Sequence, residues 1–234
     1  MSNQDSNVRS IERRRREKKR KRIFLVTAFF VAAMFAIYAT YFSNWLTVKK
    51  ISVIGNQIAS SALIQTEAAI ELGTPLARVD SDAINRNLAD ISSVDHVEVR
   101  RAWPNEIVLA VSERVAIATI KKSNYWVFVD AKGVEYGKTF NQPKNLMVFK
   151  VSKKAARVEV AKVFNSMPGW IKSQIKTVVA KSRDDVRILL SGSRQAIIGD
   201  SSRLERKFAV LKVLMTRKAN IYDVSAPDVP VTRK

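Results

Sequence analysis

The longest apolar stretch of the chain covers residues 23–42, which contain no charged residue and directly follow a dense run of Lys and Arg. Twenty helical residues rise about 30 Å, at about 1.5 Å each, which equals the thickness of the hydrocarbon core of a bilayer. An α-helix also satisfies its own backbone hydrogen bonds where no water is present. The pattern therefore predicts one transmembrane helix, with its bounds at residues 23–44.

A cleaved signal peptide is the alternative, because it also begins with basic residues and continues into an apolar segment. Its apolar core is only about 7–15 residues long and ends at small residues. The segment here is longer and ends among aromatic residues, which are typical of a helix that meets lipid headgroups. These are Tyr38, Tyr41, Phe42 and Trp45. A retained membrane anchor is the favoured interpretation.

The distribution of charge predicts the orientation of this helix. Residues 1–22 contain ten Lys and Arg against three Asp and Glu, and a basic excess beside a span holds that end in the cytoplasm. We expect residues 1–22 to be a basic cytoplasmic tail that sets topology, with a site for nucleic acid or anionic lipid as the alternative. No nucleic acid is expected as a partner. The residues after the span should lie outside the cytoplasm.

The outer part of the chain is also basic, and it lacks cysteine. The formal charge is +20, of which the 212 residues after residue 22 carry +13, from thirty-one bases and eighteen acids. Such a surface suits anionic wall polymers, lipid headgroups or an acidic protein partner, although an ordinary solvated surface is the simplest interpretation. The absence of cysteine excludes disulfides and a thiol nucleophile.

Hydrophobic periodicity predicts a small domain over residues 47–115, with the order strand, helix, helix, strand, strand. This order gives a three-stranded sheet with both helices on one face. The first strand is expected at 48–54 and ends at Gly55-Asn56. A helix from Ser60 or Ser61 to Gly73 follows, with Leu63, Ile64, Ala68 and Leu72 on its buried face, and a second helix begins near Asp80. Two more strands are expected at 94–101 and 107–113, joined by a turn at 103–105.

A second, β-rich domain is predicted over residues 116–231, and residues 232–234 remain as a short tail. Strands are expected at 125–129, 134–136, 146–151, 175–180, 186–190, 195–198 and 221–224, with one helix around 158–164. A second helix, capped by Asp200 or Ser201, would bury Leu204, Phe208, Leu211 and Met215 and expose Arg203, Arg206, Lys207, Lys212 and Arg217. Because Pro227 and Pro230 oppose regular structure, residues 221–224 should form the last strand, at the edge of the sheet.

Several of these residues resemble a known family. Gly55-Asn56 after a juxtamembrane strand, Arg101-Ala-Trp103-Pro104 and Glu113-Arg114 resemble the POTRA domain of the FtsQ/DivIB family of bacterial divisome proteins. The order of tail, span, POTRA domain and second domain is also similar, over residues 10–231. The resemblance implies an α+β protein, in which a β-α-α-β-β POTRA domain precedes a β-rich domain of mostly antiparallel strands with packed helices.

The resemblance implies a non-enzymatic scaffold in the plasma membrane at the division septum. In this family the β domain binds FtsB, which travels with FtsL, and the POTRA domain meets other divisome proteins, so septal peptidoglycan synthesis is controlled indirectly. An edge strand offers unpaired backbone groups to a partner strand. The expected partner-binding residues are Ile221, Tyr222, Val224, Ser225 and Pro227, with Arg203, Arg206 and Lys207 available to acidic groups of the partner.

Two pairs in the POTRA motif have alternative interpretations. Trp103-Pro104 is expected to be a structural turn whose indole covers the sheet, with partner binding as the alternative. Glu113-Arg114 either contributes to recruitment or pairs locally.

The sequence offers few candidates for catalysis. The single histidine, His96, alternates with Glu98 and Arg100 on the expected polar face of a strand, and clustered metal ligands are missing. A turn, helix cap or strand end explains each of Asp130, Asp184, Asp185, Asp200 and Asp223. No glycine-rich phosphate loop is present. We expect no catalytic residue, metal or cofactor. A membrane-anchored wall-polymer enzyme and a POTRA-type chaperone for secreted chains remain alternatives.

Overall fold

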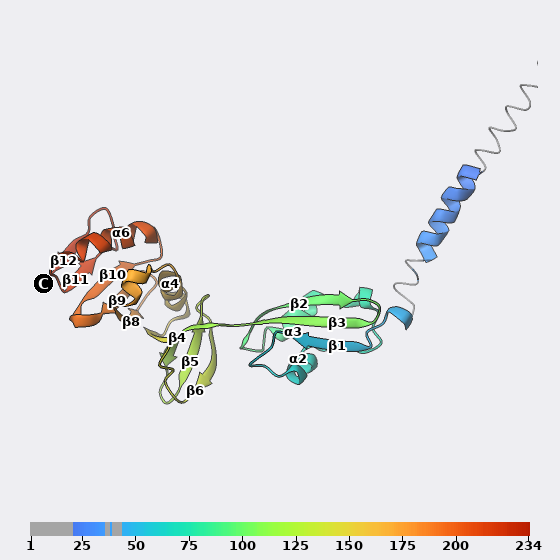
Figure 1. Ribbon diagram of the computed structural model, residues 1–234, viewed down its shortest axis with the longest axis horizontal. Helices are drawn as coiled ribbons and strands as arrows, with labels where there is room; N and C mark the ends of the chain where they lie inside the picture. Colours follow the sequence, from blue (N-terminus) through green and yellow to red (C-terminus); the bar gives the residue numbers. More distant parts are fainter. Residues whose placement is uncertain (1–20, 36–37, 39–43) are drawn as a thin grey trace, which may run out of the picture. The chain divides into compact units, whose positions relative to one another are not determined.

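The computed structural model of the protein describes residues 21–35, 38 and 44–234 (Figure 1). The chain divides into two compact units. The first comprises residues 1–90 and 96–112, and the second comprises residues 91–95 and 113–234. Each unit combines a β-sheet with packed helices, so the predicted α+β class is confirmed.

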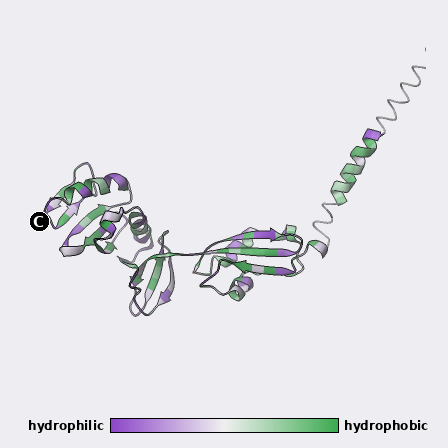
Figure 2. Ribbon diagram, in the orientation of Figure 1, coloured by the Kyte–Doolittle hydropathy of each residue, from purple (hydrophilic) through white to green (hydrophobic). Residues whose placement is uncertain are grey.

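A helix covers residues 21–35, and Figure 2 shows that most of it is hydrophobic. Its apolar side chains are exposed almost throughout. Among the residues that the structure describes, no helix combines the length and the apolar character required to cross a membrane. The predicted span at 23–44 includes residues 36, 37 and 39–43, which lie outside the described residues, as does the predicted tail up to residue 20.

The first unit contains a three-stranded sheet in the order β1-β3-β2, in which β1 runs parallel to β3. Its elements are the 3-10 helix η1 (Asn44–Leu46), β1 (Lys50–Ile54), α2 (Ser61–Ala68), the 3-10 helix η2 (Leu76–Arg78), α3 (Ser81–Leu88), β2 (Val94–Ala102) and β3 (Glu106–Glu113). The order of these elements agrees with the predicted one.

Alternation along the central strand builds the core of this unit. Ile107, Leu109 and Val111 of β3 are buried, and so are residues of both helices, such as Ile64 and Ile84. The helices also begin where the sequence predicts. The hydroxyl of Ser60 accepts a hydrogen bond from the N–H of Leu63, and Asp80 accepts from the N–H groups of Asp82 and Ala83.

The end of α2 differs from the prediction. The helix stops at Ala68, and Ala69 follows in the left-handed conformation with φ of 50°. Leu63 and Leu72, expected on the buried face, are exposed. Helical spacing alone suggested a longer helix. Residues 73–75 instead pair with Thr47 and Val48, just before β1, and this pairing is incompatible with a continued helix.

The second unit contains a nine-stranded sheet in the order β12-β11-β10-β9-β8-β7-β4-β5-β6. Its strands are β4 (Ala116–Lys121), β5 (Trp126–Asp130), β6 (Glu135–Thr139), β7 (Met147–Val151), β8 (Ile175–Ala180), β9 (Val186–Leu190), β10 (Gln195–Gly199), β11 (Ile221–Asp223) and β12 (Val231–Arg233). Helices α4 (Lys154–Asn165), α5 (Gly169–Lys172) and α6 (Leu204–Leu214) and the 3-10 helix η3 (Ser191–Ser193) complete the unit. Five of the eight strand pairs are antiparallel.

One face of this sheet is fully buried. Phe149, Val178, Ile188, Ala196 and Tyr222 lie side by side across the strands from β7 to β11, and each is at most 1% exposed. Residues of α4 and α6 belong to the same core cluster. The adjacent row, which points to the opposite face, is exposed or half-buried. The helices therefore cover one face and leave the other partly open to solvent.

Three predictions for this unit were wrong. Strand β4 was not predicted, although three of its six residues are buried. A further strand, β12, follows β11 and pairs with it antiparallel, so residues 232–234 are not simply a tail. Helix α6 is preceded by Arg203 at φ of 49°, which makes no side-chain cap, instead of by a capping Asp200 or Ser201.

Gly55 gives a test of the first unit. It adopts φ of +84°, and a Cβ there would press on the carbonyl oxygen of Val111, whereas Gly73 at φ of +89° faces open space. We expect Gly73→Ala to cost about 1 kcal/mol of unfolding free energy, from backbone strain alone. Gly55→Ala should cost about 2–3 kcal/mol, since the clash adds to the strain. Midpoints of urea denaturation measure both, and equal losses would contradict the steric argument.

Candidate functional site

The predicted edge strand is an inner strand of the sheet. β11 pairs with β10 on one side and with β12 on the other, with Ile221 opposite Arg233 and Asp223 opposite Val231. Within the described residues, β12 pairs only with β11. The free backbone edge at this end of the sheet therefore belongs to β12.

Burial separates the predicted partner-binding residues into two groups. Tyr222, Val224 and Pro227 are buried, and the hydroxyl of Tyr222 donates a hydrogen bond to the carbonyl oxygen of Arg217. The side chains of Tyr222 and Val224 belong to the core cluster, so the predicted exposure of these side chains at a sheet edge is wrong. Ile221 is half-buried and Ser225 is exposed. On the neighbouring edge strand, Val231 is 41% exposed.

Two of the predicted basic residues form exposed ion pairs. Arg203 and Arg206, at the start of α6, each place a guanidinium nitrogen 2.6 Å from a carboxylate oxygen of Asp228. The hydrogen bond from Arg203, supported by the charge of Arg206, holds the pKa of Asp228 below its usual range. The loop between β11 and β12 is thereby tied to α6, and both arginines remain at the surface.

Lys207 is not at the surface, contrary to the prediction. Its side chain is 0% exposed, and its Nζ donates to the carbonyl oxygen of Asp200 at 3.0 Å and to Oδ1 of Asp200 at 2.6 Å. The hydrogen bond from Lys207 is the main cause that lowers the pKa of Asp200. Helical spacing placed Lys207 on the polar side, but the loop before α6 folds over its long aliphatic stem.

Arg114 is the centre of an ion-pair cluster in the second unit. Its Nη1 lies 3.1 Å from Oδ1 of Asp95 and 2.6 Å from Oδ2 of Asp130. The N–H of Arg114 donates to Ser93, and its carbonyl oxygen accepts from the hydroxyl of Tyr136. Of the two interpretations offered for this residue, the contacts support local pairing. Recruitment through Glu113 stays a prediction.

The other residues of the POTRA motif have structural roles in the first unit. The guanidinium of Arg101 donates to the carbonyl oxygens of Leu76 and Val79, at 2.9 and 2.8 Å. Asn56 donates from its amide to Ala59. The predicted turn at residues 103–105 is present, but the indole of Trp103 is largely exposed and covers little of the sheet.

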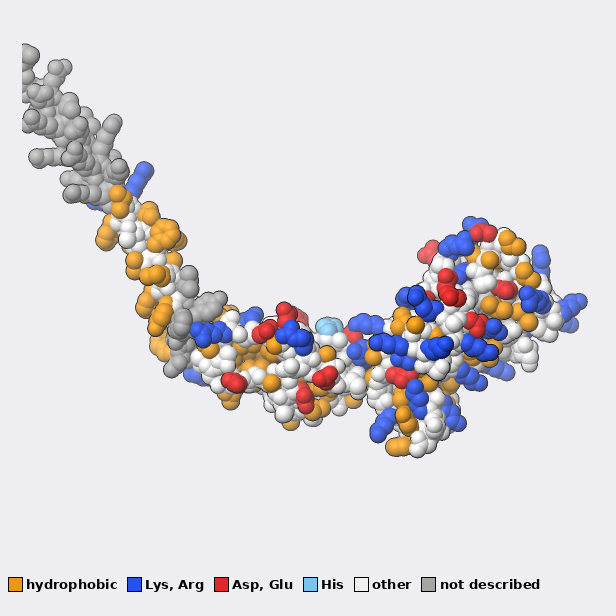
Figure 3. Space-filling view, turned by 180° about the vertical axis from the view of Figure 1, so that it is seen from behind, with side chains coloured by type: hydrophobic (Ala, Val, Ile, Leu, Met, Phe, Trp, Pro, Cys, Tyr) orange, Lys and Arg blue, Asp and Glu red, His pale blue; other side chains and the backbone are white. Residues whose placement is uncertain are grey.

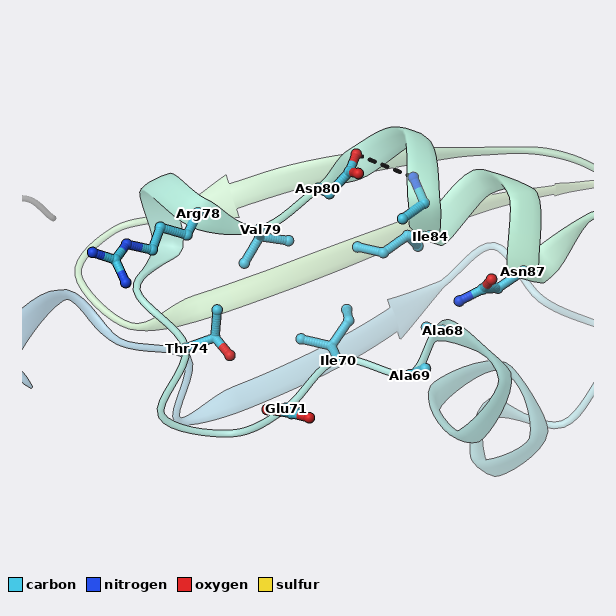
Figure 4. A pocket seen from close by; sticks show the side chains of 11 residues that line it. Ala68, Ala69, Ile70, Glu71, Thr74, Arg78, Val79, Asp80, Ile84 and Asn87 are labelled. Atoms are coloured by element: carbon cyan, nitrogen blue, oxygen red, sulfur yellow. Dashed lines mark hydrogen bonds between the residues drawn. The ribbon is translucent and has the colours of Figure 1, made fainter.

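A small pocket of about 220 Å³ lies on the helical side of the first unit. Figure 4 shows Ile70, Val79 and Ile84 pointing into it, with the cap between Asp80 and α3 at its rim. Typical ligand pockets measure about 300–1,000 Å³. This pocket is therefore suited to a single apolar side chain at most.

The positive charge is concentrated in the second part of the chain. Residues 113–234 contain twenty-five Lys and Arg against ten Asp and Glu, whereas residues 23–112 contain six against eight. Figure 3 shows basic side chains spread over the visible face of the second unit. A cleft of about 530 Å³ there is lined by Lys121, Trp126, Lys150 and Lys181. Net attraction for an acidic partner therefore arises from this unit.

Four of the five carboxylates considered for catalysis have structural partners, and Asp184 is exposed. Asp130 contacts Arg114, Asp185 contacts Arg187, and Asp223 accepts from Ser225. Throughout the described part of the chain, no group of three or more His, Asp or Glu side chains could hold a metal ion. The geometry supports binding through the β12 edge and its basic surroundings.

Comparison with known proteins agrees with this architecture. A family model described as "POTRA domain, FtsQ-type" matches residues 46–114, and one described as "Cell division protein FtsQ/DivIB, C-terminal" matches residues 118–227. Cell division protein FtsQ of Streptomyces bingchenggensis is 31% identical, over 93% of this chain and 88% of the relative. FtsQ of Streptomyces coelicolor is 28% identical, over 95% and 91%.

A solved structure gives a weaker match. The major extracytoplasmic domain of DivIB from Geobacillus stearothermophilus is 15% identical over 46% of this chain and 98% of that chain, with a TM-score of 0.33.

The fold and the two matched regions define a protein with an FtsQ-type POTRA domain followed by a β-rich domain. The chain belongs to the FtsQ/DivIB family of cell division proteins. The resemblance seen in residues 55–114 is thereby confirmed.

The contact between Lys207 and Asp200 predicts a pH dependence of stability. Because the folded pKa of Asp200 is depressed, its contribution is complete above the unfolded pKa of about 3.9 and is lost as the pH falls below that value. Asp200→Asn, which keeps an acceptor for Lys207, should flatten the fall in melting temperature between about pH 4 and pH 2.5. The effect should be about 1 kcal/mol or less, since solvent screens a half-exposed carboxylate.

The matched control for this measurement is Asp184→Asn, which removes an exposed carboxylate 16 residues earlier in the sequence. An identical slope for both variants would contradict the role assigned to Asp200.

Proposed function

We propose that the protein is a non-enzymatic scaffold of the divisome, anchored by one span and located at the septum. Two observations support the anchor: the uncharged segment at residues 23–42, and the exposed apolar side chains of the helix at residues 21–35, which water would not favour. The ten basic residues in residues 1–22 support a cytoplasmic N-terminus, since a basic excess beside a span favours the cytoplasmic side. Residues 45–234 would then lie outside the cytoplasm.

The proposed binding site is the free edge of β12. A strand that is paired on one side presents unpaired N–H and C=O groups, to which a partner peptide adds as a further strand. The single observation that carries this proposal is that β12 pairs only with β11 among the described residues. The partner we propose, on the family resemblance, is FtsB together with FtsL, and the POTRA domain would meet other divisome proteins.

The structure of the edge changes the roles of the residues first proposed. Val231, Thr232 and Arg233 form the edge strand itself, and Ile221 and Ser225 lie beside it with exposed or half-buried side chains. Tyr222 and Val224 support it from the core, and Pro227 is also buried. Arg203 and Arg206 would attract acidic groups of the partner. Through this complex the protein would influence septal peptidoglycan synthesis.

Substitution on the edge strand tests the site. Val231→Asp places a charge on the strand to which the partner would pair, and we expect binding of the extracytoplasmic segment of FtsB from the same organism to weaken at least about ten-fold. Val229→Asp is the matched control, because Val229 is 74% exposed and precedes the strand. Isothermal titration calorimetry with both full-length variants measures the difference.

Equal affinities for the two Val variants would move the binding site away from β12. Tyr222 and Val224 are unsuitable for this test, because substitution of a buried core residue destabilises the fold and removes binding for that reason alone.

A second test addresses the arginines. Asp228→Asn releases Arg203 and Arg206 from their ion pairs, so an acidic partner should associate about two- to ten-fold faster at low salt, with a steeper salt dependence. Asp184→Asn changes the net charge equally at another exposed position and serves as the control. Stopped-flow association rates measure this, and equal acceleration by both variants would contradict a local role for the arginines.

A further inference from the structure

Three large apolar side chains are exposed at the end of the first unit where the chain enters β1. Trp45 is 85% exposed, Leu72 is 67% exposed and Trp103 is 55% exposed. Exposed single apolar residues are common, but three at one end of a small domain form a patch that calls for an apolar contact. We first predicted that the indole of Trp103 covers the sheet, and that role does not explain its exposure.

Backbone hydrogen bonds hold the loops that carry these residues against the entering chain. The N–H of Val48 donates to Thr74 and the carbonyl oxygen of Val48 accepts from Gly73, each at 2.8 Å. The N–H of Lys49 donates to Asn105, also at 2.8 Å. The loop at residues 71–75 and the turn at residues 103–105 therefore flank residues 47–49 on a fixed framework.

The length of the connecting chain limits how far this end lies from the membrane. Thr47 and Val48 are buried, so the domain begins at residue 47, and the proposed span ends at residue 44. Three extended residues cover about 10 Å, and the 3-10 conformation of η1 over Asn44–Leu46 shortens that distance. The interfacial layer of a bilayer leaflet is itself about 5–8 Å thick.

We propose that this end of the first unit rests in the headgroup layer of the membrane, with Trp45, Leu72 and Trp103 inserted at the boundary with the acyl chains. The inference rests on the proposed membrane anchor. Tryptophan suits this position because its indole combines a large apolar surface with one N–H donor. Contact at several points would restrict how the POTRA domain tilts on its short connection.

The charges around the patch are consistent with a lipid surface. Lys49 is exposed beside the entering chain and would meet phosphate groups. Glu106 is paired with Lys50 at 3.0 Å, which reduces its repulsion from anionic lipids. Glu71 is exposed next to Leu72 and limits the depth of insertion on that side. The patch is therefore suited to shallow contact.

The test uses full-length protein in nanodiscs. In a Trp45→Phe, Trp126→Phe, Trp170→Phe background, Trp103 is the only tryptophan. Lipids brominated on the acyl chain near the headgroup should quench its emission at least about two-fold relative to ordinary lipids. The matched reporter adds Trp103→Phe and Ile54→Trp to the same background. Ile54 is exposed at the opposite end of β1, about 13 Å farther along the strand, and its tryptophan should not be quenched.

Alkaline extraction of the same samples separates the two hypotheses. Protein that remains with the lipid while Trp103 is unquenched overturns the inference and leaves the anchor intact. Equal quenching of both reporters also overturns it, because the domain would then lie along the membrane instead of resting on one end. Protein that is released from the lipid overturns the anchor and the inference together.

Discussion

The in-register row of buried side chains from Phe149 to Tyr222 is the constraint on which the second unit depends. The row shares one core cluster with residues of α4 and α6, and removal of any of its larger side chains would leave a cavity that costs about 2–5 kcal/mol. The row ends at Tyr222 of β11, which pairs with β10 on one side and with β12 on the other. The free edge at this end of the sheet therefore belongs to β12.

Charged residues in the second unit serve both stability and attraction. Lys207, Arg114 and Arg157 are largely buried and satisfied by carboxylates or carbonyl oxygens, since an unpaired buried charge is costly. The remaining bases lie at the surface and give residues 113–234 a large positive excess. Only these surface charges attract partners over long distances. The buried charges therefore stabilise the fold, and the surface charges influence encounters with partners.

The first unit differs from the second in its charge and in the kind of surface it presents to other molecules. Residues 23–112 carry slightly more acids than bases, and the pocket of this unit is too small for a typical ligand. Its exposed apolar residues instead gather near the point where the chain enters the domain. A short connection and a patch at the same end suit a domain that holds its position close to a bilayer.

The sequence by itself determined the α+β class, most element positions and the family, because periodicity, glycine turns and caps such as Ser60 and Asp80 act locally. The motif Arg101-Ala-Trp103-Pro104 was recognisable for the same reason. Only the tertiary structure decided that Lys207 is buried, that α2 ends at Ala68 and that β12 replaces residues 221–224 as the edge. Each of these three features depends on contacts between segments that are distant in sequence. The free energy of such contacts outweighs local helix and strand preferences, and the contacts produce no periodic pattern along the chain.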